Sequence, residues 1–274
     1  MDGAVPVLRA SFKMTARRNG DKFYFSSAFF RNTADWHVKN EGNFSCYYTS
    51  AVNWDKVNEY IKKAKEFDKK LHAPVYTTYM YFCGNLPNLL QLLGVEYKTD
   101  YNGITHDNFS SFENNGYLDI IGGNEAAPAV LDIHDLWHAR LHHVVDIAII
   151  NRPVDEGCAY LYGGGSWGYS WDKIFKEFKA FMGTDKDWLT AYNEHKNFCE
   201  NKHTPLYTDY LINALIVRQI EREKGFGAVV ELLNCGKKEA DNANYFRALD
   251  KIAGINKDNF NERVGKLVGE ESVK

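Results

Sequence analysis

Four of the nine histidines fall within ten residues, in the stretch "HDLWHARLHH" that runs from 134 to 143. On an α-helix, positions i and i+4 lie on one face about one turn apart, so His134 and His138 can point two imidazoles at one cation. Two such imidazoles supply two of the four tetrahedral ligands that Zn²⁺ takes in proteins. His142 continues this face, but a further turn carries it too far along the helix axis to join the pair easily. Taken alone, the pair fits a metal site and an ordinary surface or capping pair equally well.

A catalytic zinc site usually has three protein ligands and one position open to water. The best-placed third ligand is Glu156, in "NRPVDEGCAYLYGG", with seventeen residues between it and His138. A helix running on to Ile150 would carry the chain about 18 Å away, and the six remaining residues, at about 3.4 Å each, could barely return. The histidine helix is therefore predicted to end or bend soon after His143, where the β-branched run "VVDIAII" begins. Pro153 is then expected to start a second helix that presents Glu156.

Asp135 follows His134 directly, at the position where the motif H-E-x-x-H carries a glutamate that acts as general base. Aspartate is one methylene shorter, so its carboxylate reaches about 1–1.5 Å less far. General-base contact requires about 2.6–3.2 Å, and a misplacement of about 1 Å can lower the rate around a hundredfold. Two interpretations stay open: Asp135 is the base of a working site, or the site binds metal with little or no turnover.

The order of these motifs resembles that of the gluzincin zinc metallopeptidases, most closely their peptidase-MA-like group. That group has H-E-x-x-H, a short connection and then Pro-x-(hydrophobic or Asp)-Glu-Gly-x-Ala, to which "HDLWH" and "PVDEGCAYLYGG" are similar. The segment 43–83 resembles the group's hairpin, long helix and central strand, and "NGYLDIIGG" (115–123) resembles its edge strand just before the active-site helix. The segment 207–233 resembles a helix ending in a small-residue step and the helix after it. About two-thirds of the chain is covered.

The resemblance implies a zinc-dependent peptidase that hydrolyses peptide bonds in a peptide or protein substrate, with water as nucleophile. The implied zinc ligands are His134, His138 and Glu156. Asp135 would be the base that takes the proton of the water and delivers it to the departing amine. A downstream Tyr or His stabilises the oxyanion in family members, which here implies Tyr207 or Tyr210. The alternative is a catalytically weakened or inactive metallopeptidase-like binding protein that retains the metal site, and a metal-free helical scaffold is a third.

The elements that must position these residues follow from periodicity and turn residues. Strands are expected in the first 35 residues, with "KFYFSSAFF" (22–30) the clearest, and at 74–83 and 115–123. Helices are expected over about 53–71, over 84–94 with an end at Gly94, and from Pro128 through the histidines. Beyond Trp171 the chain is helical in character, with apolar stripes in 171–182, 208–225 and 242–254.

This order predicts an α+β fold and, with the resemblance, a gluzincin or thermolysin-like catalytic fold. A small mixed sheet is expected to pack on the active-site helix, followed by a mostly helical lobe. The whole chain, 1–274, is interpreted as one peptidase-like unit. Its sheet-rich lobe is 1–127, with one long helix, and its lobe 128–274 carries the active-site helix and the later helices.

Composition restricts partners and compartment. The net charge of −3 gives no electrostatic reason to expect nucleic acid or an anionic membrane. No run of about 18 apolar residues predicts a membrane span. The start lacks the apolar segment of a signal peptide, so the compartment stays open between the cytoplasm and export with a leader already removed. Oligomeric state also stays open.

Two further features argue against other kinds of site. Five cysteines without a C-x-x-C spacing disfavour a disulfide framework or a cysteine-based zinc site, although a single bridge such as Cys199–Cys235 stays open. The glycine-rich stretch "GGGSWGYSW" (163–171) lacks the Lys-Ser/Thr ending of a phosphate loop and a strand before it. It is expected to be a turn or loop near the cleft.

Overall fold

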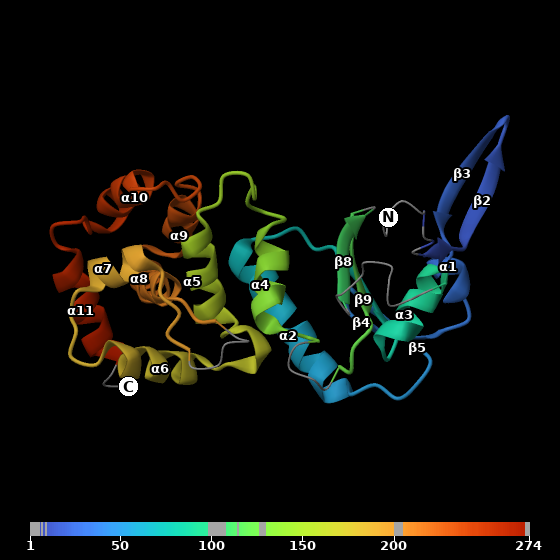
Figure 1. Ribbon diagram of the computed structural model, residues 1–274, viewed down its shortest axis with the longest axis horizontal. Helices are drawn as coiled ribbons and strands as arrows, with labels where there is room; N and C mark the ends of the chain where they lie inside the picture. The colour runs from blue at the N-terminus through green and yellow to red at the C-terminus, as the bar shows by residue number, and fades with distance from the viewer. Residues whose placement is uncertain are drawn as a thin grey trace. The chain divides into compact units, whose positions relative to one another are not determined.

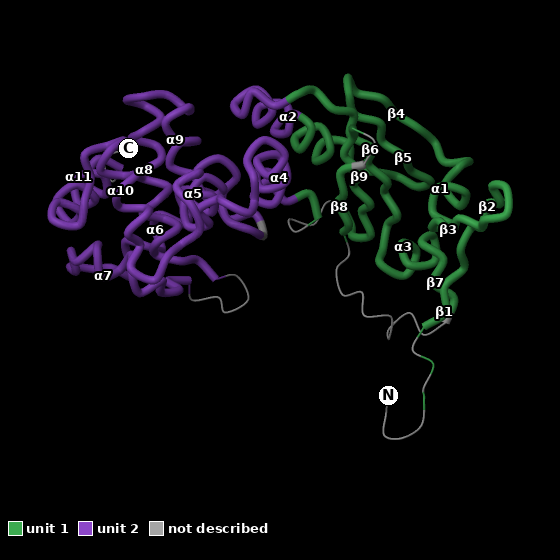
Figure 2. Tube along the Cα trace, turned by 90° about the horizontal axis from the view of Figure 1, so that it is seen from above, with its two compact units in different colours: residues 1–61, 74–131 green, residues 62–73, 132–274 purple. Residues whose placement is uncertain are grey.

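The computed structural model describes residues 6, 8, 10–97, 108–113, 115–125, 130–199 and 205–271. The chain divides into two compact units (Figure 2): unit 1 is 1–61 with 74–131, and unit 2 is 62–73 with 132–274. Strands belong to unit 1 and most helices to unit 2 (Figure 1). The structure is mixed α+β, with a small sheet and a helical region, which confirms the predicted class at that level.

Unit 1 is built on a five-stranded sheet in the order β4-β5-β6-β9-β8. The strands are β4 (His37–Glu41), β5 (Phe44–Tyr48), β6 (Thr77–Phe82), β8 (Asn108–Glu113) and β9 (Gly116–Ile121). β5, β6 and β9 run parallel, and the strands at both edges run antiparallel to their neighbours. The strand predicted within 74–83 is β6, and its central place is confirmed.

The prediction that "NGYLDIIGG" forms an edge strand is wrong, because β9 lies between β6 and β8. β8 precedes β9 in the chain. The chain reverses direction at Asn115, whose φ is +60°, so that β8 pairs with the side of β9 that β6 does not occupy. The sequence of β8, "NFSSFE", has only two apolar residues. A strand of that composition gives little sign of itself in the hydrophobic pattern.

The two helices predicted in the first half of the chain are confirmed. α2 (Trp54–Leu71) begins in unit 1 and ends in unit 2, and it buries Val57, Ile61, Ala64 and Phe67 at helical spacing. α3 (Leu86–Leu93) ends at Gly94, which has φ +98°. A Cβ atom at position 94 would lie 2.2 Å from the carbonyl oxygen of Lys13, so only glycine fits there. The next strand, β7 (Val95–Tyr97), pairs with β1 (Ser11–Phe12).

The N-terminal region also contains β2 (Met14–Asn19) and β3 (Lys22–Ser27), which form a separate two-stranded sheet. The predicted strand "KFYFSSAFF" is correct up to Ser27 and wrong at its end, where α1 (Phe29–Asn32) begins. The Ser27 hydroxyl accepts the backbone N–H of Phe29 at 3.1 Å, and the Phe29 ring packs edge-on to that of Tyr81 at 4.9 Å. Burial of this ring turns the chain out of the strand.

Unit 2 consists of helices. They are α4 (Ile133–Leu141), α5 (Arg152–Tyr162), the 3₁₀ turn η2 (Ser166–Gly168), α6 (Trp171–Met182), α7 (Trp188–Glu194), α8 (Thr208–Lys224), α9 (Phe226–Leu233), α10 (Ala243–Ala253) and α11 (Phe260–Glu271). The three helices predicted after Trp171 are α6, α8 and α10. α8 is the most buried of them, and α5 packs on it so closely that a Cβ atom at Gly157 would lie 2.7 Å from the Cβ of Asn213.

The histidine helix begins later than predicted. Asp132 caps α4 by accepting the backbone N–H of His134 at 2.9 Å, and Pro128 lies outside the described residues. All five cysteines are free thiols, so no bridge joins Cys199 to Cys235. Among the helices of the described residues, none has the length and apolar character needed to cross a membrane.

Candidate metal centre

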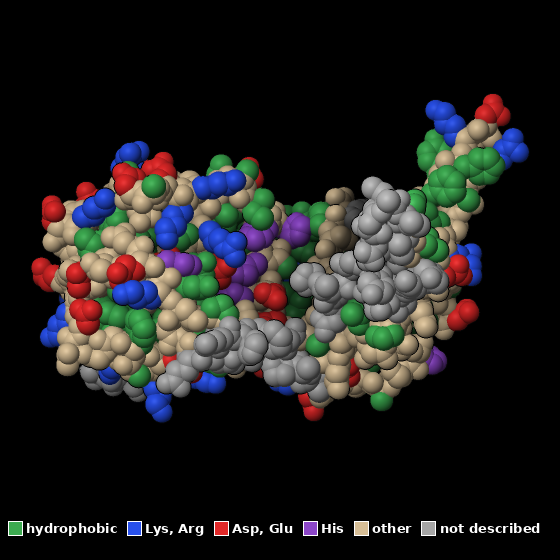
Figure 3. Space-filling model, viewed as in Figure 1, with side chains coloured by type: hydrophobic (Ala, Val, Ile, Leu, Met, Phe, Trp, Pro, Cys, Tyr) green, Lys and Arg blue, Asp and Glu red, His purple; other side chains and the backbone are tan. Residues whose placement is uncertain are grey.

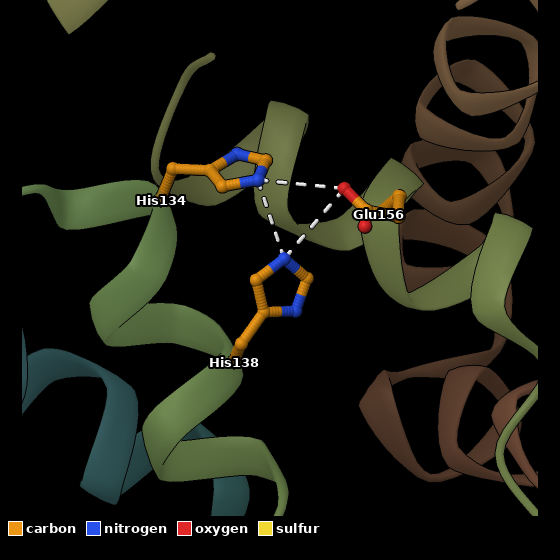
Figure 4. Close-up of side chains that lie close together, drawn as sticks. All are labelled: His134, His138 and Glu156. Atoms are coloured by element: carbon orange, nitrogen blue, oxygen red, sulfur yellow. Dashed lines mark hydrogen bonds and ion pairs between the residues drawn. The ribbon is translucent and has the colours of Figure 1, made fainter. Parts of the chain in front are cut away.

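The predicted end of the histidine helix and the predicted second helix are both confirmed. α4 stops at Leu141, and α5 begins at Arg152 with Pro153 in its first turn. Figure 4 shows the consequence: His134 and His138 from α4 point at Glu156 from α5. The sequence-predicted ligands are therefore brought together within unit 2.

The three facing atoms have the spacing of a tetrahedral metal site. The Nε2 atoms of His134 and His138 are 3.2 Å apart. Oε2 of Glu156 lies 3.4 Å from the first and 3.6 Å from the second. Ligand atoms placed tetrahedrally at about 2.0–2.1 Å from Zn²⁺ are about 3.3–3.4 Å from each other. The donor set thus fits an ion of this size.

The second ring nitrogen of each histidine has its own acceptor. Nδ1 of His134 lies 2.9 Å from the carbonyl oxygen of Gly164, and Nδ1 of His138 lies 2.9 Å from Oδ1 of Asp155. Because a carbonyl and a carboxylate only accept, each Nδ1 donates its proton to that acceptor, and each ring turns Nε2 toward Glu156. Three lone pairs then converge on one point, which requires a cation or a proton there.

The closeness of these groups shifts the pKa values of His138 and Glu156. Burial lowers the pKa of His138, but the carboxylates of Asp155 and Glu156 outweigh it and raise that pKa to about 10. Burial raises the pKa of Glu156, but the two imidazoles outweigh it and hold that pKa well below its usual range. Arg152 approaches the other carboxylate oxygen, with 3.3 Å between its terminal nitrogen and Oε1 of Glu156. Glu156 is therefore ionised, with Oε2 left for a metal.

The glycine-rich loop has a structural role in this site. Gly164 has φ +83° and supplies the carbonyl that orients His134. A Cβ atom at Gly163 would lie 2.7 Å from the carbonyl oxygen of Ile133. The loop can therefore approach the start of α4 because position 163 is a glycine, and the positive φ at position 164 also favours glycine. The predicted turn beside the site is confirmed, with Ser166 on the cavity wall.

Asp155 is a functional candidate that sequence reasoning missed, and His142 is one that it set aside as too far along the helix. Asp155 is 4% exposed, and its Oδ2 lies 3.0 Å from Nε2 of His142, while Oδ1 holds His138. The group His138, His142 and Asp155 could also hold a metal ion. The signal in the sequence was that Asp155, an acid, directly precedes the predicted ligand Glu156.

A cavity of about 340 Å³ opens onto the three ligand atoms. It brings the other predicted site residues, Asp135, Tyr207 and Tyr210, to the same place as His134, His138 and Glu156. The remaining lining residues are Arg152, Tyr160, Ser166, Pro205 and Leu206. All belong to unit 2, and Asp135 is exposed.

The two tyrosines are held by a polar network behind the cavity. Burial, with the charge of Glu156, raises the pKa of Tyr210 to about 12, so its hydroxyl keeps its proton at neutral pH. The ring of Tyr207 stacks on His195 with 4.0 Å between centroids. Nδ1 of His195 is 2.6 Å from Oδ1 of the fully buried Asp209. Sequence reasoning missed His195 and Asp209, which are fourteen residues apart and meet only in the fold.

Comparison with known proteins identifies no family for this chain. No protein-family model matches the sequence, and no curated protein matches it. The gluzincin resemblance therefore stays a prediction from the motifs, and the case for a function depends on the side chains themselves.

Proposed function

We propose that this protein is a zinc-dependent peptidase with a gluzincin, thermolysin-like catalytic fold. One observation carries the proposal: two imidazole nitrogens and a carboxylate oxygen lie 3.2–3.6 Å apart, at the wall of a cavity. The site has three protein ligands and an open side, as catalytic zinc sites have and closed structural sites do not. The sequence of histidine helix, short connection and "PVDEG" helix supports the gluzincin type.

Bound Zn²⁺ would supply a Lewis acid that polarises a substrate carbonyl and lowers the pKa of water. The chain provides the remaining functions. Asp135, on the same cavity, takes a proton from the attacking water and passes it to the departing amine. Tyr210 is protonated at neutral pH and donates a hydrogen bond to the oxygen on which negative charge develops. Tyr207 lines the same wall and is the second candidate for that role.

The alternative is a metal-binding protein of the same architecture with little or no turnover. It is favoured by one observation, the aspartate at position 135, whose reach is about 1–1.5 Å shorter than that of the glutamate in H-E-x-x-H. Under this alternative the metal serves structure or ligand capture. Both functions predict that the protein binds a metal, but only the first predicts cleavage of peptides, so two measurements are needed.

The first measurement is the metal content of the purified chain by plasma mass spectrometry. We expect about one equivalent of zinc for three protein ligands. Glu156→Ala and His138→Ala each remove a ligand and are expected to lower zinc affinity on the order of a thousandfold. Glu262→Ala, a change at an exposed glutamate in α11, is the matched control and should leave it unchanged. Absence of metal from the unaltered protein would sink both functions and leave a metal-free scaffold.

The second measurement is cleavage of a mixed peptide library with and without a chelator. The peptidase proposal expects chelator-sensitive cleavage that Asp135→Asn lowers around a hundredfold or more. Asp135→Glu restores the reach of the base and is expected to raise the rate. Zinc binding without cleavage, followed by cleavage in the Asp135→Glu variant alone, would establish the weakened-site alternative.

A further inference from the structure

Exposed apolar side chains are concentrated near the N-terminus of unit 1. Of the fourteen large hydrophobic side chains exposed in the described residues, seven lie between positions 8 and 30. These seven are Leu8, Phe12, Met14, Phe23, Tyr24, Phe25 and Phe30. Four of them belong to the β2–β3 ribbon, residues 14–27, which projects from the rest of unit 1 in Figure 1. Contiguous exposed apolar side chains of this kind mark interaction surfaces.

The ribbon is amphipathic. Its register pairs Ala16 with Phe25 and Arg18 with Phe23, and directly paired residues project from the same face. Met14 and its partner Ser27 belong to this face as well, which makes it apolar apart from Ser27 at its base and the arginine near the tip. The opposite face carries Thr15, Arg17, Asn19, Lys22, Tyr24 and Ser26.

Nothing in the described part of unit 1 adds a third strand to this ribbon. All six residues of β3 are exposed, and Phe23 and Phe25 keep 60% and 65% of their surface in contact with solvent. A two-stranded ribbon is at best marginally stable in water by itself. Its apolar face therefore gains most from a surface that covers it.

The charge of the ribbon indicates what that surface is. Arg17, Arg18 and Lys22 against Asp21 give residues 14–27 a net charge of +2, in a chain whose net charge is −3. Figure 3 shows hydrophobic side chains along the projection and charged ones at its tip. The overall charge, which gave no reason to expect an anionic membrane, conceals this local excess of positive charge.

We propose that the β2–β3 ribbon docks this protein on an anionic lipid surface. Phe23, Phe25 and Met14 enter the boundary between headgroups and acyl chains, as apolar faces of peripheral proteins do. Arg18 extends from the apolar face to the headgroup phosphates. Arg17 and Lys22 lie on the opposite face and add attraction to the anionic surface over about a Debye length. A second copy of the chain is a poorer occupant because two ribbons of charge +2 repel each other.

Flotation with lipid vesicles tests the proposal on the full chain. Binding is expected to vesicles of phosphatidylcholine with 30% phosphatidylglycerol, about tenfold or more above binding to pure phosphatidylcholine, and to weaken with salt. The double variant Phe23→Ser, Phe25→Ser is expected to lower the partition coefficient roughly tenfold or more. Arg18→Gln is expected to lower it about fivefold. The matched controls are Phe181→Ser, at an exposed ring of unit 2, and Lys251→Gln, at an exposed cation. Both should leave the partition coefficient unchanged.

Two neighbouring tryptophan variants then report which face is covered. Phe25→Trp places an indole on the apolar face, and its added emission should shift to shorter wavelength and be quenched by brominated lipid. Tyr24→Trp places it on the opposite face, where no such shift is expected. Equal shifts in both variants would overturn the assigned face.

Three results would overturn the docking proposal. The first is no binding to anionic vesicles, and the second is binding that the Phe23→Ser, Phe25→Ser variant leaves unchanged. The third is concentration-dependent dimerisation that the same variant abolishes, because the occupant would then be a second copy of the chain. None of these measurements depends on zinc or on peptidase activity.

Discussion

The two units distribute polar and apolar side chains in opposite ways. Of the twelve polar or charged side chains buried in the described residues, ten lie in unit 2, including every charged one. Unit 1 buries only Thr33 and Thr78 of this set. Conversely, ten of the fourteen exposed large hydrophobic side chains in the same residues belong to unit 1. Unit 2 buries charges, and unit 1 exposes apolar groups.

Each arrangement is unfavourable for folding in isolation, and that is what makes the comparison informative. A buried charge loses its hydration and must recover that free energy from partners. An exposed apolar face forgoes the stabilisation that burial would supply. Of the buried charged residues of unit 2, His134, Asp155 and Glu156 converge on the candidate metal centre. The others have partners elsewhere: Arg140 pairs with Asp68, Asp209 pairs with His195 and Lys238, and Asp132 caps α4. Three of the six exposed aromatic residues of unit 1 lie on the β2–β3 ribbon. The proposed catalytic site and the proposed lipid-docking surface therefore fall in different units.

The largest effect on the stability of unit 2 is expected from breaking a buried ion pair. Arg140 is 1% exposed, and its guanidinium nitrogen lies 3.6 Å from Oδ2 of Asp68, near the end of α2. Asp68→Ala leaves the buried guanidinium without this carboxylate, and we expect the free energy of unfolding of unit 2 to fall by about 3 kcal/mol. Urea denaturation followed by circular dichroism measures it.

A matched double variant separates the charge from the packing. Asp68→Leu with Arg140→Met replaces the pair by apolar side chains of similar length, and most of the lost stability should return. A double variant less stable than Asp68→Ala would show that the pair itself stabilises unit 2, contrary to the expectation that pairing merely offsets the burial of charge.

The next effect is on the metal. Asp155→Asn keeps the shape of the side chain but removes the charge that Oδ1 and Oδ2 present to His138 and His142. A partner that orients a ligating histidine typically contributes 10–100-fold in metal affinity, so zinc affinity should fall about that much. Competition with a chromophoric chelator measures the change, and Asp172→Asn, at an exposed acid in α6, is the control. An unchanged affinity would mean that Asp155 serves the fold alone.

How much of this site could be predicted from the sequence depends on whether the information was local. His134 and His138 share a face by helical periodicity, and the reach of the chain required the turn that brings Glu156 to them. These statements need only bond lengths and helix geometry. The partners of the second ring nitrogens, Asp155 and the carbonyl of Gly164, depend on how α5 and the glycine loop pack on α4. No spacing in the sequence specifies that packing.

The same division explains the errors in the fold. Periodicity predicted α2, α6 and α10 because each buries one stripe, whereas α8 is buried on every side from 208 to 217. The gluzincin resemblance misplaced β9 at an edge because a strand's place in a sheet depends on its neighbours. Periodicity gave no sign of the neighbour β8, which has only two apolar residues in "NFSSFE". It extended β3 through Phe29 because an aromatic run favours a strand, whereas burial of that ring against Tyr81 decided the local structure.

The smallest effect is expected where unit 1 exposes its aromatic rings. Phe25→Ser removes a ring that is 65% exposed, and surface changes of this kind usually alter the free energy of unfolding by less than about 0.5 kcal/mol. Phe29→Ala, four residues along, removes a ring that is 2% exposed in the core of unit 1 and should lower that free energy by about 3–5 kcal/mol. Urea denaturation of both variants without lipid gives the comparison. A loss above about 1 kcal/mol for Phe25→Ser would show that the ring packs on the protein, since an exposed ring has little folding free energy to lose. A small loss would show that Phe25 contributes little to the free energy of unfolding. The vesicle measurements then test whether the ring contributes to lipid binding instead.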